Sequence, residues 1–134
     1  SVVKTPFDFK IFKPLVAGLR STESQITQSG GYDHCFVLDN NDQLKKAAVV
    51  RHPWSGRIMT ISTTEPGIQL YTANHIDGFE GKDAIYYGRY PAFCLETQHF
   101  PNSPNEADFP STALKAGETF KSQTIYNFSL THED

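Results

Sequence analysis

The sequence predicts an all-β fold, an antiparallel β-sandwich, with residues 1–134 belonging to one domain. Three observations support this prediction. Short apolar and β-branched runs recur along the chain, clusters of Gly, Pro, Asn and Asp separate them, and no segment has a convincing amphipathic-helix period. Regular short strands joined by turns are typical of a sandwich. Hydrophobic residues make up 38% of the 134 residues and aromatic residues 13%, which suffices for a packed core.

The first three predicted strands alternate with turn-forming clusters. Residues 35–39 form a short apolar run that ends in Asp39-Asn40-Asn41-Asp42, a cluster of turn formers. Residues 45–52 resume the extended pattern as far as a tight connection at Pro53-Trp54-Ser55-Gly56. Residues 57–63 then alternate and are rich in β-branched side chains, which predicts the third strand.

The middle of the chain is predicted to contain one strand and one long loop. Glu65-Pro66-Gly67 reads as a turn, and residues 68–73 form the strand that follows it. Residues 77–91 hold four Gly or Pro among several tyrosines, which indicates a long surface loop. Loops of that length are usually functional or mobile.

Two more strands are predicted in the last third of the chain. Residues 93–98 form an apolar run interrupted by one charge. An irregular, proline-rich segment follows, and Ala116-Gly117-Glu118 forms a turn. Residues 119–130 alternate between apolar and polar side chains, which predicts a half-buried strand.

Charge and hydropathy exclude two classes of partner. The net charge of −3 is spread along the chain without a basic stripe, so we expect no nucleic-acid partner. No apolar run approaches the roughly 20 residues that span a bilayer, so we expect no membrane insertion. The first residues lack the pattern of a signal peptide, which favours the cytoplasm, although the sequon Asn127-Phe128-Ser129 leaves secretion as the alternative.

The two cysteines, Cys35 and Cys94, are too few for a disulfide framework. We expect both to be buried free thiols that pack as small hydrophobes. A bridge between them stays an alternative if their strands are neighbours.

Two acids stand out against apolar surroundings. Glu96 lies in the run Phe93-Cys94-Leu95-Glu96-Thr97-Gln98, and Asp33 lies in Gly31-Tyr32-Asp33-His34-Cys35-Phe36. Burying a charge is costly unless a partner or a function uses it, so the two acids are predicted to converge on one polar site. The alternative is that Glu96 faces water on an edge strand while Asp33 caps a turn.

No metal site is predicted from the histidines. None of them combines with a carboxylate in a metal-ligand spacing such as H-E-x-x-H. We therefore expect surface or hydrogen-bonded histidines and no metal. The five positions are His34, His52, His75, His99 and His132. The sequence also contains no glycine-rich phosphate loop, and we expect no organic cofactor.

Several segments together resemble the galactose mutarotases (aldose 1-epimerases). The resemblance rests on the two acid motifs at 31–36 and 93–98 and on residues 63–74, Thr-Thr-Glu-Pro-Gly-Ile-Gln-Leu-Tyr-Thr-Ala-Asn, between them. Residues 5–9, 100–105 and 114–120 are similar to family segments as well. The resemblance implies an antiparallel β-sandwich that interconverts the α and β anomers of free aldohexoses such as galactose or glucose.

The resemblance also implies roles for three residues. Glu96 matches the general base of the family. Asp33 and Gln69 match residues that hydrogen-bond the sugar hydroxyls. His34 follows the sugar-binding acid in the motif, but no catalytic role carries over to it.

The general acid of the family has no counterpart in this chain. It is a histidine from the N-terminal part of the sandwich, so the chain resembles the C-terminal portion alone. We therefore expect the N-terminal part as a partner, most simply as a separate chain. Without it, this chain is expected to be inactive, with exposed sheet edges.

Two other functions compete with the epimerase. A non-catalytic sugar-binding protein on the same scaffold would use Asp33 and Gln69 equally well, although it has less need of Glu96. A glycosidase would use Asp33 and Glu96 as its pair of carboxylates, at a separation that sequence does not reveal.

Overall fold

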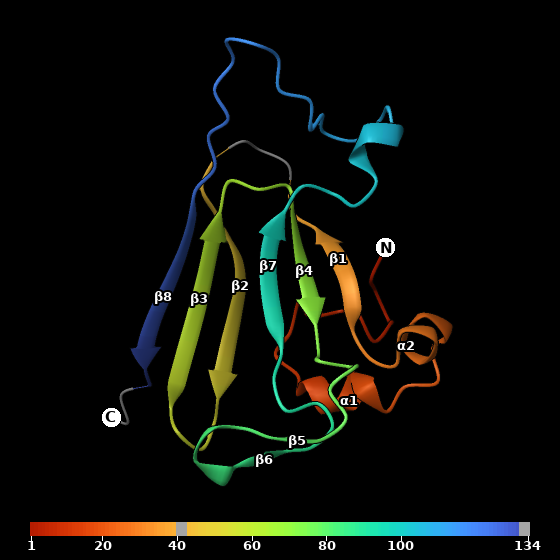
Figure 1. Cartoon of the computed structure of the whole chain (residues 1–134), viewed down its shortest axis with the longest axis vertical. Coiled ribbons are helices and arrows are strands. Elements are labelled where there is room, and N and C mark those ends of the chain that lie inside the picture. Colours follow the sequence, from red (N-terminus) through yellow and green to blue (C-terminus); the bar gives the residue numbers. More distant parts are fainter. Residues whose placement is uncertain (40–42, 132–134) are drawn as a thin grey trace. The chain divides into compact units, whose positions relative to one another are not determined.

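The computed structural model describes residues 1–39 and 43–131. Most of its regular structure is extended, as predicted for an all-β chain (Figure 1). The strands of the described residues are β1 (Asp33–Val37), β2 (Lys45–His52), β3 (Arg57–Thr63), β4 (Gly67–Tyr71), β5 (Phe79–Glu80), β6 (Tyr86–Tyr87), β7 (Cys94–Gln98) and β8 (Thr124–Leu130). The helical segments are α1 (Leu15–Leu19), α2 (Ser24–Ser29) and the 3₁₀ turns η1 (Lys82–Ala84) and η2 (Ser103–Asn105).

The strands form three sheets with the orders β1-β4-β7, β2-β3-β8 and β5-β6. Pairing is antiparallel between β2 and β3, between β3 and β8, and between β5 and β6. Figure 1 draws neighbouring strands of the sheet β1-β4-β7 in opposite directions as well. The prediction of antiparallel sheets is confirmed.

The chain divides into two compact units. The first unit comprises residues 1–34 and 69–95, and the second comprises residues 35–68 and 96–134. Each strand of the sheet β1-β4-β7 contributes residues to both units.

The β2–β3 hairpin organises the second unit. Its register runs from Lys45 opposite Thr63 to His52 opposite Arg57, with one irregularity after Lys46. Both strands have the predicted bounds, because the connection at residues 53–56 ends one strand and starts the next. The buried residues Ile61 and Thr63 lie on β3, between β2 and β8.

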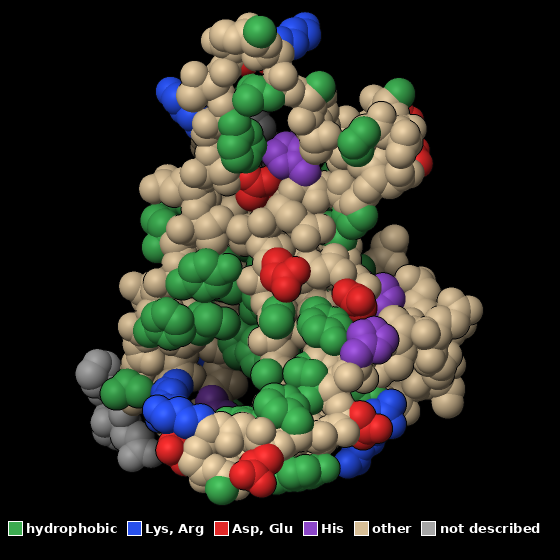
Figure 2. Space-filling view, viewed as in Figure 1, with side chains coloured by type: hydrophobic (Ala, Val, Ile, Leu, Met, Phe, Trp, Pro, Cys, Tyr) green, Lys and Arg blue, Asp and Glu red, His purple; other side chains and the backbone are tan. Residues whose placement is uncertain are grey.

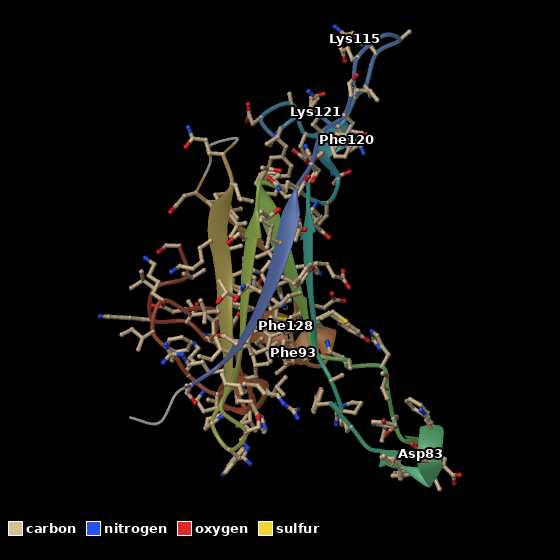
Figure 3. The ribbon with its side chains drawn as sticks, turned by 90° about the vertical axis from the view of Figure 1, so that its left-hand side faces the viewer. Asp83, Phe93, Lys115, Phe120, Lys121 and Phe128 are labelled. Atoms are coloured by element: carbon tan, nitrogen blue, oxygen red, sulfur yellow. The ribbon has the colours of Figure 1, made fainter. Side chains whose placement is uncertain are left out.

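Strand β8 differs from the prediction in length and in burial. It begins at Thr124, so residues 119–123 are not part of a strand. Its side chains beyond Thr124 are exposed, and Phe128 on this strand is 74% exposed (Figure 3). The prediction of a half-buried strand is therefore wrong for the described residues, because β8 pairs with β3 only and ends its sheet. The alternation of apolar and polar side chains correctly predicted a strand, but it does not show whether another element packs against the apolar face.

The core of the first unit is built around Tyr32. The side chain is fully buried, with its ring 5.9 Å from the ring of Phe7 and 5.4 Å from that of Phe9. Its hydroxyl donates a hydrogen bond to the carbonyl oxygen of Pro6 at 2.8 Å. A Cβ on Gly18 would lie only 1.6 Å from that hydroxyl, so α1 approaches the ring at a glycine.

Two features of the first unit depart from the predictions. The short helices α1 and α2 were not expected, since five or six residues are too few to establish a helical period. Helix α2 is capped by the Glu23 carboxylate, which accepts from the backbone of Gln25, and it ends at Gly30 in the left-handed conformation. The predicted loop at 77–91 contains the small β5–β6 hairpin. In the part of the chain that the structure describes, no helix has the length and apolarity to cross a membrane.

Both cysteines are free thiols, so the alternative of a bridge is not realised. Cys35 is half-buried, and burial raises the pKa of its thiol despite hydrogen bonds to Gln98 and to the backbone of Ile68, which act in the opposite direction. Cys94 is exposed, which contradicts the prediction that both thiols are buried. Position 94 is the first residue of β7, and the exposed positions 94 and 96 alternate there with the half-buried position 95.

Candidate functional site

Asp33 and Gln69 lie together in the first unit. Asp33 is the first residue of β1, and Gln69 is in the middle of the neighbouring strand β4. The Nε2 of Gln69 donates a hydrogen bond to Oδ1 of Asp33 at 2.7 Å. The structure thus brings together two residues that lie 36 positions apart in the sequence.

The side chain of Gln69 keeps an unused acceptor. Its Oε1 is buried and has no hydrogen-bond partner among residues 1–39 and 43–131. Leaving a buried acceptor unpaired costs about 1–3 kcal/mol, which a ligand donor would offset. Asp33 is exposed and, as a carboxylate, also accepts hydrogen bonds. The exposed carboxylate of Asp33 therefore presents acceptors suited to hydroxyl donors, while Oε1 of Gln69 is a buried acceptor without a partner among the described residues.

A network of hydrogen bonds holds the backbone just before Asp33. The backbone N–H of Tyr32 donates to Oγ1 of Thr72, and the N–H of Thr72 donates to the carbonyl of Tyr32, both at 3.0 Å. The amide of Asn74 donates to the same carbonyl at 2.9 Å. Gly31 has φ +148°, and a Cβ there would lie 2.3 Å from Oδ1 of Asn74, so only glycine fits. Sequence reasoning assigned no role to Thr72 or Asn74.

His34 supports Asp33 from its own strand. Its Nδ1 accepts a hydrogen bond from the backbone N–H of Asp33 at 2.9 Å, and its ring packs edge-on against Phe7 at 4.7 Å. Because Nδ1 accepts, the neutral ring carries its proton on Nε2. Burial lowers the pKa of His34, while the negative charges of Asp33 and Glu23 oppose that shift.

The lowered pKa of His34 predicts that the fold loses stability on acidification. The unfolded chain takes up the proton near the ordinary value of 6.5, whereas the folded chain resists protonation until a lower pH. The His34 contribution is therefore present above pH 6.5 and is lost as the pH falls toward the folded-state pKa. Urea unfolding midpoints are measured between pH 5 and 7.5 for the unmutated chain and for His34→Asn, whose Oδ1 keeps an acceptor for the N–H of Asp33. The midpoint should fall less steeply with decreasing pH in the variant. Parallel curves for the two proteins would contradict this assignment.

Glu96 lies in the middle of β7 with its side chain exposed, between the half-buried Leu95 and Thr97. Among the described residues, β7 is the terminal strand of the order β1-β4-β7. The burial cost inferred from the apolar sequence therefore does not arise, because alternation directs this carboxylate away from the core. In the space-filling view of Figure 2, acidic side chains are visible at the molecular surface. Glu96 belongs to the second unit, so its convergence with Asp33 stays a prediction.

A second polar cluster, which the sequence did not predict, surrounds Glu65 in the second unit. Glu65 is 6% exposed, and its carboxylate is bonded by Nδ1 of His99 at 2.7 Å and by the hydroxyl of Ser122. The cluster borders an open cavity of about 250 Å³. The residues lining the cavity are Thr64, Glu65, Pro66, His99, Pro110, Phe120 and Lys121. In Figure 3, Phe120 and Lys121 lie on the segment that leads into β8.

The histidines and acids that the structure describes do not gather as metal ligands. Within residues 1–39 and 43–131, no group of three or more His, Cys, Asp or Glu side chains could hold a metal ion. Of the five histidines considered above, His132 lies outside the described residues, as do residues 40–42 of the predicted turn.

Comparison with known proteins matches nearly the whole chain. The sequence model of the aldose 1-epimerase family matches residues 1–127. Galactose mutarotase from Mus musculus is 40% identical over 127 residues, which cover 94% of this chain and 36% of the mouse protein. Aldose 1-epimerase from Escherichia coli is 32% identical over 133 residues, which cover 96% of this chain and 38% of the bacterial protein.

The fold agrees with the sequence relationship. The crystal structure of a GalM/aldose epimerase homologue from C. elegans superposes with a TM-score of 0.82 at 26% identity, and the match covers 98% of this chain and 39% of the homologue. The predicted all-β sandwich of the mutarotase type is confirmed by this likeness. The chain spans less than two fifths of the length of each of these relatives. A match that extends over residues 1–127, together with this fold, makes the chain a member of the aldose 1-epimerase family.

Proposed function

We propose that this chain supplies the base and the sugar-binding residues of an aldose 1-epimerase acting on free aldohexoses such as galactose or glucose. The observation that carries the proposal is the Asp33–Gln69 pair, in which one hydrogen bond orients both side chains and leaves Oε1 of Gln69 buried and unpaired. Family membership supplies the reaction class.

The reaction requires two coordinated proton transfers. The C1 hydroxyl loses a proton while the ring oxygen gains one, and the ring opens to the aldehyde. Rotation about C1–C2 and reclosure then give the other anomer. Glu96 is the proposed proton acceptor for the C1 hydroxyl, since its carboxylate is exposed on a strand and is therefore accessible to a sugar.

Asp33 and Gln69 are proposed to align the sugar with that base. Their oxygens accept hydrogen bonds from two or more hydroxyls, which fixes the rotation and depth of the ring. Fixed geometry matters because a displacement of about 1 Å at the reacting atoms can cost about 100-fold in rate. The Thr72 and Asn74 bonds to the Tyr32 backbone keep Asp33 in place.

The proton donor is proposed to come from the N-terminal part of the family fold. Two observations support a further part: the chain matches only 36% of the mouse relative, and β8 exposes apolar side chains such as Phe128 and Leu130. The N-terminal part completes the sandwich, either in the same polypeptide or as a separate chain. We refer to this chain together with that part as the complete assembly.

Polarimetry on freshly dissolved α-galactose tests the proposal. The complete assembly should accelerate the approach to anomeric equilibrium, whereas the 134-residue chain alone should leave the spontaneous rate unchanged because it lacks the acid. Sugar binding by the assembly without any acceleration would instead identify a sugar-binding protein. Release of reducing sugar from a glycoside would identify a glycosidase.

A further inference from the structure

The buried carboxylate of Glu65 makes a link between two segments of the second unit. Its side chain is 8% exposed, and each of its two oxygens accepts one hydrogen bond, from His99 and from Ser122. Its backbone N–H donates to Oγ1 of Thr63 at 3.0 Å, at the end of β3. A buried carboxylate with both oxygens occupied is held firmly, because moving either partner would leave a buried charge unpaired.

His99 is the second half of this link. A carboxylate oxygen accepts hydrogen bonds, so we assign Nδ1–H of His99 as the donor in the 2.7 Å bond. Hydrogen bonds to charged acceptors are about twice as strong as neutral ones. The bond therefore ties the chain immediately after β7 to the turn that precedes β4.

Glu96 lies only three residues before His99, and a second anchor lies between them. The hydroxyls of Thr97 and Thr124 share a hydrogen bond of 2.7 Å, and Thr124 also shares one of 3.0 Å with the buried Thr63. Thr97 points to the face opposite Glu96, as alternation along a strand requires. Two side-chain bonds thus hold the backbone that follows Glu96, while its carboxylate stays exposed.

We propose that Glu65 and His99 are positioning residues for Glu96. Their bond fixes the end of β7 and so holds the carboxylate of Glu96 at the position where it meets the C1 hydroxyl. The inference rests on the proposed function of Glu96 as the base. Neither Glu65 nor His99 contacts the sugar in this role, so the loss of either should lower kcat more than it changes KM.

The test compares His99→Ala with His99→Asn in the complete assembly. Alanine removes the donor, whereas the amide nitrogen of asparagine takes the place of Nδ1. Mutarotation is measured by polarimetry, and functional sites are counted by calorimetric titration with galactose. We expect kcat per binding site to fall about 10- to 100-fold for the alanine variant, with KM within about twofold, and to recover largely for the asparagine variant.

His52→Ala is the matched control. His52 also forms a 2.7 Å hydrogen bond through Nδ1, to Ser55, but it lies on the β2–β3 hairpin. Its loss should leave kcat unchanged. A second pair of variants, Glu65→Ala and Glu65→Gln, should reproduce the result for the two His99 variants. The alanine variant should lose kcat and the glutamine variant should largely keep it, because glutamine keeps an acceptor for His99 and gains a donor toward Ser122.

Four results would decide against the inference or its premise. An unchanged kcat per binding site in His99→Ala overturns the inference. A loss of activity that comes only from fewer binding sites overturns it as well, because it shows that the bond is purely structural. An unmutated assembly that binds galactose without accelerating mutarotation overturns the proposed function instead. If His99→Ala does not fold, His99→Gln, whose donor is displaced by one methylene, takes its place, and kcat equal to the unmutated value then overturns the inference.

Discussion

Replacing Glu96 by glutamine is expected to remove nearly all mutarotase activity from the complete assembly while sugar binding remains. The amide has almost the same shape as the carboxylate but cannot accept a proton from the C1 hydroxyl. General base catalysis contributes about 10²- to 10⁴-fold, so kcat should fall by that factor. The exposed position of Glu96 on β7 means that the change should cost little stability.

Polarimetry measures the rate in this variant, and calorimetric titration with galactose measures the binding constant. Glu80→Gln is the control, because Glu80 is also an exposed strand glutamate, on β5, and has no proposed role. A near-normal rate in Glu96→Gln would remove Glu96 as the base. A loss of galactose binding equal to the loss of rate would make it a binding residue.

Replacing Asp33 by alanine is expected to weaken both sugar binding and turnover. The change removes the carboxylate acceptor and also releases Nε2 of Gln69, which Asp33 holds at 2.7 Å. A hydrogen bond to a charged group contributes about 1.5–3 kcal/mol, which corresponds to a loss in kcat/KM of roughly 10- to 150-fold.

The matched control is Asp77→Ala. Asp77 is an exposed acid of the first unit outside any strand. Initial rates measured over a range of galactose concentrations separate KM from kcat in both variants. The assignment of Asp33 as a sugar anchor requires KM to rise in Asp33→Ala alone. An unchanged KM together with a lowered kcat would place Asp33 in the chemistry and not in sugar binding.

Strand prediction succeeded where local signals were sufficient. Strands β2 and β3 have the predicted bounds, since strong turn formers at residues 53–56 separate two β-branched runs. The prediction failed for β8, which starts five residues later than the alternation suggested. Alternation records which side chains can share a face, whereas the start of a strand depends on the neighbour that supplies its hydrogen bonds.

The sequence alone determined the fold class, the family and the identity of the candidate residues Asp33, Gln69 and Glu96. These depend on residue types and their order along the chain, which local patterns and a family resemblance both preserve. The role of each of the three stays a prediction until the variants above are measured.

The tertiary structure alone decided which side chains meet. In the folded chain Gln69 is hydrogen-bonded to Asp33, and Nδ1 of His34 accepts a bond from the backbone N–H of Asp33. Glu65 is buried and bonded to His99 and Ser122. The bond between Glu65 and Ser122 joins residues 57 positions apart, and the energies of such contacts depend on distances and burial that exist only after the strands pair. For that reason the sequence predicted only a turn at Glu65 and a surface or hydrogen-bonded histidine at His99. Only the fold shows that these two residues are bonded to each other, next to the strand of Glu96.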